Sequence, residues 1–550
     1  MANFENCFYP FAIAFALIAA MPKKYYLETP IAKIIQVLAP LASMIFLFGS
    51  ELEDLKFLFA FIFILISLLA SINSLHSKNK LQDCSSIFYA GSAIGVVTSS
   101  NWLNFVFCWE MMLLGSVVLI LANRTTRSLN SGIRYFYVHL FSGSMVMFGV
   151  ANLPTSEFDN VIFANVNEPY ALMILIGFLI NAAAPPFHSW VPDSYPNASP
   201  TANVYLSAFT TKAAVFALIK FFPSFDPLIY VGCFMGLYGV TLAMLSNNVR
   251  KLLSCHIISQ VGYMIVGVGI GTSFSLDGSS AHAFSHILYK GLLFMTAGAL
   301  IYATGKEKIS QMGGLARQYP FVFWSFVVGA LSISGAPIFN GFISKSMIVE
   351  AAHLLHLDPV VKILNLASIG TFLSIGLKMG YYAFLNKRAI KVKQIPLNMK
   401  IAMAITGMLC ILFGLMPNLL YEMLPNQAVI KESIYQPWSK YHVIHSLEIL
   451  GIAILAFFIF KKYLKPKDKK INTVYIQIFN SICKILANTA KLLREAARKN
   501  KKEISKGFKN VFASAFKGGK DSLNEKNNFS QNLAIIIFLI SLFILVSTWK

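Results

Sequence analysis

Cysteine and acidic residues are both scarce in this chain of 550 residues. The seven cysteines are scattered, and no two of them form a CxxC pair or a cluster with histidine. Structural zinc sites and iron–sulfur clusters need such spacing, so the sequence predicts no metal site. A nucleotide- or flavin-binding motif is also missing, and we therefore expect no bound cofactor.

The acidic residues number 24 against 46 Lys and Arg, which gives a formal net charge of +22. Half of this excess lies between residues 465 and 530, where 16 Lys or Arg face 5 Asp or Glu. Aromatic residues are sparse among these charges, which argues against nucleic acid as a partner. The segment is weakly amphipathic and predicts a helix lying on anionic lipid or, alternatively, a lateral helix that docks onto a neighbouring protein.

Long polar stretches are otherwise few, because 56% of the residues are hydrophobic and apolar runs of membrane-spanning length recur along the chain. A soluble protein would need buried helices almost without polar faces over several hundred residues. We therefore predict an all-α polytopic membrane protein. Its sixteen expected spans are residues 8–21, 31–49, 55–74, 84–99, 102–122, 133–151, 170–187, 201–222, 227–246, 252–272, 280–304, 320–350 (interrupted), 362–386, 400–417, 446–462 and 531–548.

The charges of the loops predict that the N-terminus lies outside. Inward loops then carry nearly all the basic residues, and outward loops carry the acidic residues around Glu51, Glu157, Asp277 and Glu422. This agreement with the positive-inside rule favours a multi-pass protein of a bacterial inner (plasma) membrane. The first apolar run lacks a small-residue cleavage signature, so we expect it to be retained as the first helix.

Two predicted spans contain helix breakers at membrane depth: Pro185 and Pro186 in INAAAPPFHSW, and Gly335, Pro337 and Gly341 in SISGAPIFNGFISKS. Backbone groups freed by such breaks need other partners, so breaks of this kind line a cavity. The two spans are the seventh and the twelfth, five apart. This spacing predicts two five-helix repeats of opposite orientation.

The pattern divides the chain into six parts. They are N-terminal transmembrane helices (1–83), a first inverted repeat (84–222), a second inverted repeat (227–386), additional transmembrane helices (387–462), a basic cytoplasmic segment (463–530) and a C-terminal transmembrane helix (531–548).

His282, His286 and Lys290 are spaced four apart inside an otherwise apolar span. Each step of four advances about 6 Å along a helix and drifts about 40° around it, so the three side chains share one stripe. Lipid cannot host this stripe. Ionisable residues inside a membrane span are candidates for an ion or proton path.

Other titratable residues also lie at membrane depth. Glu110 is an isolated carboxylate that we expect either to pair with a lysine or to stay protonated, unless it sits near the interface. Lys212, Lys345 and Lys378 are basic groups placed too deep to reach the surface easily. His256 extends this set, although a neutral histidine bonded to a carbonyl explains it equally well. Hydrogen-bonded water would have to bridge the gaps between these groups.

Five motifs at these residues resemble one family in order along the chain. They are WEMM around Glu110, PFHSWVPDSYPNASPTA (186–202), VRKLLSCHIISQVGYM (249–264), HAFSHILYKGLLF (282–294) and GFISKS (341–346). Between about residues 30 and 420 the chain is similar to the antiporter-like membrane subunits. These include the D and A subunits of Mrp-type Na+/H+ antiporters and the large proton-pumping subunits of respiratory complex I and membrane-bound hydrogenases.

The resemblance implies a fold of fourteen core helices with two inverted five-helix repeats, which leaves two C-terminal helices outside the shared core. It implies that Glu110, Lys212, Lys290 and Lys345 transfer protons. It further implies that His282, His286, His256 and Lys378 belong to the connecting path. The expected partners are H+, Na+ and the other membrane subunits of an assembly.

One position departs from the family pattern. The family usually has a lysine five residues before the proline of PFH, and Asn181 stands there in this chain. Glu110 would therefore lose its usual partner, and we predict that it pairs with Lys212 instead or is protonated more of the time.

Three functions are compatible with these features. The preferred hypothesis is a proton-translocating subunit of a multisubunit Na+/H+ antiporter, similar to the D subunits of the Mrp type. The second is a proton-pumping membrane subunit of a quinone-linked redox complex, which would make the assembly, though not this chain alone, an enzyme. The third is a scaffold subunit that has lost transport.

Overall fold

The structure, a computed structural model, describes residues 7–154, 157–159, 161–163, 166–386, 393–432 and 435–467. Helices dominate the described part of the chain, which contains no named strand. Residues 468–530 of the predicted basic segment and the predicted helix at 531–548 lie outside the described residues.

The first half of the chain forms the following helices: α1 Tyr9–Ala20, α2 Lys23–Glu28, α3 Ile31–Phe48, α4 Asp54–Ser74, α5 Lys80–Thr98, α6 Trp102–Leu121, α7 Thr126–Ala151, α8 Pro169–Asn181, α9 Trp190–Ser194, the short 3₁₀-helix η2 Tyr195–Asn197, α10 Ala202–Ala208, α11 Thr210–Phe221, α12 Pro227–Leu245 and α13 Val249–Ile270.

The second half forms α14 Ser273–Thr304, the 3₁₀-helix η3 Ile309–Gln311, α15 Leu315–Gln318, α16 Pro320–Ser334, α17 Asn340–Leu354, α18 Asp358–Phe372, the π-helix η4 Leu373–Leu385, α19 Leu397–Leu415, α20 Asn418–Tyr421, α21 Ala428–Glu432 and α22 Lys440–Phe460.

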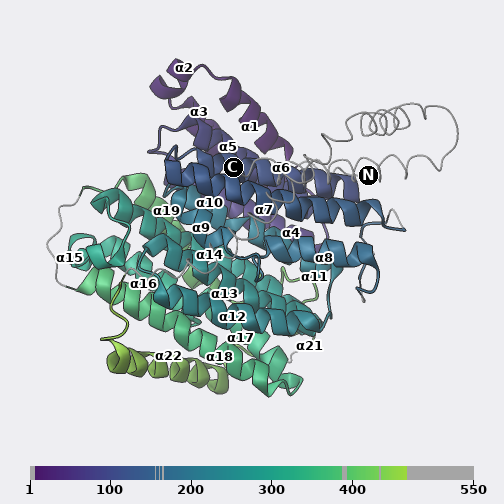
Figure 1. Cartoon of the computed structure of the whole chain (residues 1–550), viewed down its shortest axis with the longest axis vertical. Helices are drawn as coiled ribbons and strands as arrows, with labels where there is room; N and C mark the ends of the chain where they lie inside the picture. The colour runs from purple at the N-terminus through teal and green to yellow at the C-terminus, as the bar shows by residue number, and fades with distance from the viewer. Residues whose placement is uncertain are drawn as a thin grey trace, which may run out of the picture.

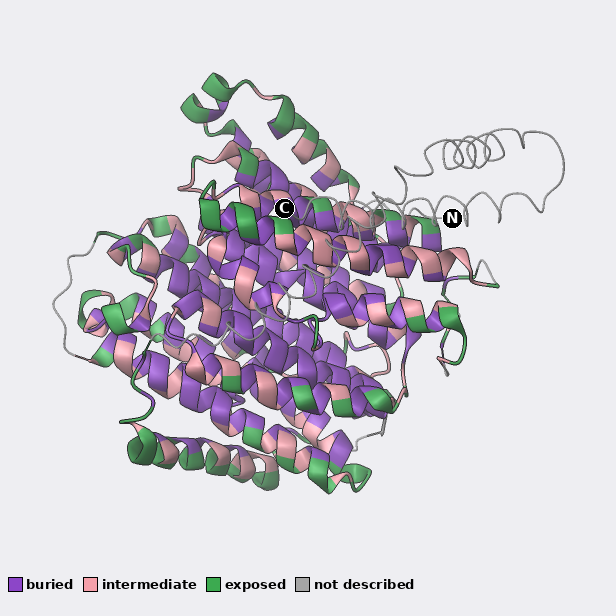
Figure 2. Cartoon of the chain, in the orientation of Figure 1, coloured by how far each residue is buried: buried purple, intermediate pink, exposed green. Residues whose placement is uncertain are grey.

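The long helices pack side by side in one bundle, with α1 to α3 at one edge and α22 at the opposite edge (Figure 1). Buried residues fill the middle of this bundle, and exposed residues gather on the outer helices (Figure 2). Within the described residues, ten helices are long and apolar enough to cross a membrane, and α1, α8 and α16 are shorter apolar helices. The predicted all-α membrane fold is therefore confirmed.

The centre of the bundle is held by close contacts between small residues. A Cβ atom added at Gly232 of α12 would lie 2.5 Å from the carbonyl oxygen of Gly262 in α13, and the reverse contact is the same length. Membrane helices associate through such close backbone contacts because lipid supplies no hydrophobic drive between them. All of the apolar 18-residue window of α13 is buried.

Both predicted helix interruptions are present. One separates α8 from α9, and the other, at residues 335–339, separates α16 from α17. Side chains take over the backbone groups that these breaks release. At the second break, Lys345 Nζ donates to the Ile333 carbonyl at 3.3 Å, and Ser446 Oγ of α22 donates to the Gly335 carbonyl at 2.6 Å.

Two further irregularities were not predicted. The span expected at 201–222 is divided at Phe209, because the Thr210 amide donates to the hydroxyl of Tyr89 at 3.0 Å. The span expected at 362–386 changes from an α-helix to a π-helix at Leu373. Neither position carries a proline, so the sequence offered no sign of a tertiary contact or a wider helical turn.

Gly341, just after the second break, has no room for a larger side chain. A Cβ atom there would overlap with the backbone carbonyl of Ser332, which cannot rotate away. We expect Gly341→Ala to lower the free energy of unfolding by about 1–3 kcal/mol, the usual effect of overpacking. Thermal melting in detergent measures this loss.

Gly451→Ala is the matched control, because a Cβ atom at Gly451 meets nothing within 4 Å. If both variants melted at the same temperature, the tight packing at the break would be refuted.

A cluster of charges joins the ends of α4 and α11 to the loop after α7. Asp159 accepts hydrogen bonds from Lys56 at 2.6 Å and from Lys220 at 2.9 Å. Partial burial acts to raise the pKa of the Asp159 carboxyl, but these two bonds and the two positive charges outweigh it and hold that pKa below its usual range. The cluster therefore stabilises the fold above the pKa of a free aspartate, and this contribution is lost as the pH falls through the lowered value.

Candidate functional site

The three predicted stripe residues of α14 are fully buried and line up along one helix face. His282 bonds through Nδ1 to Ser344 Oγ of α17 at 3.1 Å and through Nε2 to Gln260 Oε1 of α13 at 3.2 Å. The rings of His282 and His286 have centroids 6.4 Å apart. The stripe thus faces neighbouring helices and not lipid, as predicted.

The middle of the stripe carries polar atoms that nothing in the described chain satisfies. Both ring nitrogens of His286 and the Lys290 ammonium are buried without a hydrogen-bond partner among the described residues. Buried polar atoms are normally bonded to protein or to ordered water. Unpaired donors and acceptors at this depth therefore mark places where water can enter.

Lys212 joins this region from α11. Its ammonium donates to the Ser207 carbonyl at 2.6 Å and to Thr211 Oγ1 at 3.2 Å, and its charge is repelled by that of Lys290. The positive charges of both lysines also repel a positive charge on His286. Protonation at one of these three groups consequently changes the energy of protonation at the others.

Lys345 lies at the other end of the stripe. Its ammonium is 4.7 Å from the ring centroid of Tyr263, and the Tyr263 and His282 rings have centroids 5.9 Å apart. The side chains therefore form a spatial series from the break between α16 and α17 to the stripe, in the order Lys345, Tyr263, His282. The predicted residues on different helices are brought into one buried row.

His256 of α13 and Lys378 of η4 lie near the row. The π-helix η4 holds both, since it contains Lys378 and also Ser374, which bonds to His256. Ser374 Oγ of η4 lies 2.7 Å from His256 Nε2, while Lys378 donates to the carbonyls of Met244 and, at 2.8 Å, Ser246 at the end of α12. His256 is therefore bonded to a hydroxyl and not to a carbonyl. A positive charge on His256 would be repelled by the charges of Lys290, Lys345 and Lys378.

Glu110 of α6 stands apart from the row. Its Oε1 atom is buried without a hydrogen-bond partner among the described residues, and it lies against Gly143 of α7 so closely that a Cβ atom there would overlap with it. The predicted ion pair with Lys212 does not form, because the Lys212 ammonium is directed to Ser207 and Thr211.

The structure adds a titratable group that sequence reasoning missed. His139 of α7 is buried, and its Nδ1 atom lies 2.6 Å from Oδ1 of Asn181, the position where the family has a lysine. Its Nε2 atom has no partner among the described residues. His139 precedes Gly143 by one helical turn, on the face that meets Glu110. A histidine inside the predicted span at 133–151 was the available signal.

Tyr135, Thr210 and Thr211 lie between this histidine and Lys212, with ring packing at the histidine end and hydrogen bonds further along. The rings of His139 and Tyr135 have centroids 4.1 Å apart, and the Tyr135 hydroxyl is 3.4 Å from Thr210 Oγ1. Thr211, the next residue, accepts a hydrogen bond from Lys212. The site therefore has two parts: a row from Lys212 to Lys345, and the buried Glu110 and His139 on the neighbouring helices α6 and α7, each of which keeps an unpaired polar atom among the described residues.

The sequence of the chain matches the family described as NADH:quinone oxidoreductase/Mrp antiporter, TM, over residues 99–374. That match spans half of the chain. It begins just before α6, ends in η4 and includes every residue of the site except Lys378.

Three relatives illustrate the range of similar proteins. The uncharacterized protein MJ1309 of Methanocaldococcus jannaschii is 27% identical, covering 62% of this chain and 76% of its own length. The D subunit of the Na(+)/H(+) antiporter of Alkalihalophilus pseudofirmus is 29% identical over 48% of this chain. Hydrogenase-4 component B of Escherichia coli is 27% identical over 67% of this chain. The chain spans 58% and 61% of the length of these last two relatives.

Solved structures share the fold. A chain of the Mrp complex from Dietzia sp. DQ12-45-1b superposes with a TM-score of 0.70 at 20% identity, over 82% of this chain and all of that one. A chain of the archaeal membrane-bound sulfane sulfur reductase also reaches 0.70, at 21% identity, over 98% of this chain and all of that one.

Proposed function

Because the chain belongs to the NADH:quinone oxidoreductase/Mrp antiporter family of membrane proteins, we propose that it is the proton-translocating subunit of a multisubunit monovalent cation/proton antiporter. The observation that carries this proposal is the buried row of basic groups from Lys212 through His286 and Lys290 to His282 and Lys345. Such a row has no structural use in a membrane, since each buried cation costs several kcal/mol.

The proposed transfer uses repulsion between like charges. When Lys212 binds a proton, its charge disfavours a second charge on Lys290 and on His286, so a proton there is driven along the row. Transfer from His286 to His282 and on to Lys345 would pass through water bonded to the unpaired nitrogens. His256 and Lys378 are proposed to tune this path through their charge.

Glu110 and His139 are proposed to form the input of the first half. A carboxyl group and an imidazole can exchange a proton through water bonded to the unpaired Glu110 Oε1 and His139 Nε2 atoms, which would replace the missing lysine at position 181. The hydroxyls of Tyr135 and Thr210 would carry the proton on to Lys212.

The proposal places the chain in a bacterial inner membrane with its N-terminus outside, among other membrane subunits. The basic residues 463–530 are proposed to contact anionic lipid. H+ and Na+ are the proposed ions.

A proton pump of a redox complex is the second candidate. The observation in its favour is the sulfane sulfur reductase chain, which aligns with 98% of this chain, whereas the Mrp chain aligns with 82%. A scaffold without transport is the third candidate.

Membrane vesicles that contain the chain with its neighbouring subunits separate these candidates. In an antiporter, adding Na+ to vesicles with an imposed pH gradient is expected to release protons, read with a pH-sensitive dye. Proton movement driven by a quinone-linked electron donor, and indifferent to Na+, would instead establish the redox pump. If the chain were a scaffold, Lys212→Ala and Lys345→Ala would leave either response unchanged.

A further inference from the structure

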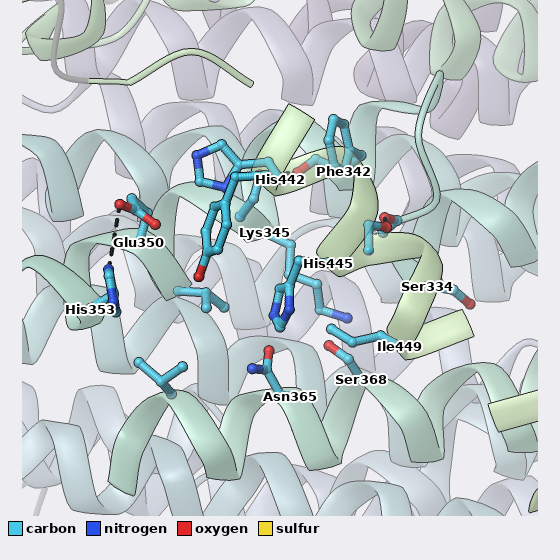
Figure 3. Close-up of a pocket in the computed structure, with 16 residues that line it drawn as sticks. Ser334, Phe342, Lys345, Glu350, His353, Asn365, Ser368, His442, His445 and Ile449 are labelled. Atoms are coloured by element: carbon cyan, nitrogen blue, oxygen red, sulfur yellow. Dashed lines mark hydrogen bonds and ion pairs between the residues drawn. The ribbon is translucent and has the colours of Figure 1, made fainter. Parts of the chain in front are cut away.

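A cavity between α17, α18 and α22 opens onto Lys345 (Figure 3). Its volume of about 80 Å³ leaves room for several water molecules, since about 10–15 Å³ is enough to hold one. The cavity is polar where it meets α17 and α22, and its wall on α18 includes Asn365 and Ser368. Water can therefore reach Lys345 from a direction that the row of basic groups does not use.

The titratable groups of this cavity form a series of rising exposure along α17. Lys345 is 4% exposed, the side chain of Glu350 is 19% exposed, and that of His353 is 52% exposed. Glu350 Oε1 lies 3.7 Å from His353 Nδ1. The step of five residues from Lys345 to Glu350 advances about 7.5 Å along the helix axis, and both side chains line the same cavity.

The opposite wall supplies two more imidazoles. His442 and His445 of α22 line the same cavity as Lys345 (Figure 3). Tyr441 is the remaining titratable residue of this wall, and the lining of α18 contributes no titratable residue. α22 is also tied to the broken helix, because Ser446 donates to the carbonyl of Gly335.

This wall lies outside the family match, which ends at residue 374. α22 is exposed over most of its surface, yet His442, His445 and Ser446 of its first turns line the cavity, while its apolar residues Leu455, Phe458 and Ile459 are exposed. An apolar helix that only filled space would not need histidines on its inner face.

We propose that the cavity between α17, α18 and α22 is a proton vestibule that connects Lys345 with the membrane surface through Glu350, His353, His442 and His445. The vestibule rests on the proposed function, since it serves the same row of proton carriers. Imidazoles and a carboxylate exchange protons, whereas Na+ prefers a set of oxygen ligands and is repelled by the Lys345 ammonium. The vestibule therefore carries protons and excludes the exchanged cation.

The experiment measures Na+-dependent proton movement in vesicles of the whole complex. His442→Cys is treated with a membrane-impermeant cationic thiol reagent, added from the side on which residue 440 is accessible. Modification is expected to reduce proton movement severalfold, because the bound reagent fills the cavity and adds a fixed positive charge that repels protons. Lys440→Cys is the matched control at the exposed start of the same helix, and its modification should leave the flux unchanged.

Glu350→Gln tests the same path without chemical modification. It is expected to slow proton movement, and Glu350→Asp to restore most of it, while Glu422→Gln, an exposed carboxylate outside the cavity, should have no effect.

A His442→Cys variant that resists modification, or that keeps full flux once modified, would overturn the vestibule while the wild type still exchanged protons for Na+. Protection of the cysteine by Na+ would overturn it in favour of a cation site. Loss of Na+-dependent flux in the wild type itself would instead refute the proposed function.

Discussion

Lys212→Ala is expected to lower Na+-dependent proton exchange by about tenfold or more, because it removes the group at which the first half of the chain meets the buried row. Lys212 is fully buried, and its ammonium is held by one carbonyl and one hydroxyl without a carboxylate. Removing a buried cation relieves a desolvation cost, so the variant should melt at or above the temperature of the wild type. Dye-monitored proton movement and thermal melting measure the two effects.

Two further variants complete this test. Lys362→Ala removes an exposed lysine of α18 and should leave exchange unchanged. Lys212→Arg keeps the charge but cannot release a proton, so it should be as inactive as the alanine variant. Full activity in Lys212→Arg would show that only a fixed charge is needed, and the relay through this residue would be wrong.

His139→Leu is expected to reduce proton exchange by about tenfold, and Asn181→Lys in the same chain is expected to restore much of it. The reason is geometric. His139 Nδ1 lies 2.6 Å from Oδ1 of Asn181, so a lysine at position 181 would place its ammonium near the space that the imidazole leaves. Because lysine and histidine differ in basicity, the rescued chain should reach its maximal rate at a different pH.

The double variant distinguishes a proton carrier from a packing residue. Both variants should be assembled and folded, as judged by melting temperature. If His139→Leu/Asn181→Lys stayed as inactive as His139→Leu while melting like the wild type, His139 would have only a structural role.

Much of the fold followed from local patterns. Apolar runs of spanning length predicted the membrane helices, and the breakers at Pro185, Pro186, Gly335 and Pro337 located both interruptions. These features act within a few residues of themselves, through backbone dihedrals and missing donors, so one sequence is enough to find them. The division at Phe209 and the π-helix at Leu373 depend on distant contacts and had no such local cause.

Some features of the site also followed from local patterns, whereas others depended on distant contacts. The spacing of His282, His286 and Lys290 alone determined that they share a face, and the length of the apolar span determined that this face must avoid lipid. Which residues face them could not be read from spacing. Gln260 and Ser344 come from helices 22 and 62 residues away from His282, and His139 meets Asn181 across 42 residues.

The sequence by itself therefore determined an all-α membrane protein, its two broken helices and the buried set of Lys and His residues, because composition and helical periodicity are local properties. Only the tertiary structure decided that Glu110 lies against Gly143, that His139 meets Asn181, and that Glu110 forms no ion pair with Lys212. It also decided that α22 closes a cavity over Lys345. Partners of buried charges are set by which helices pack together, and that packing depends on small residues such as Gly143, Gly232 and Gly262, whose contacts lie far along the chain.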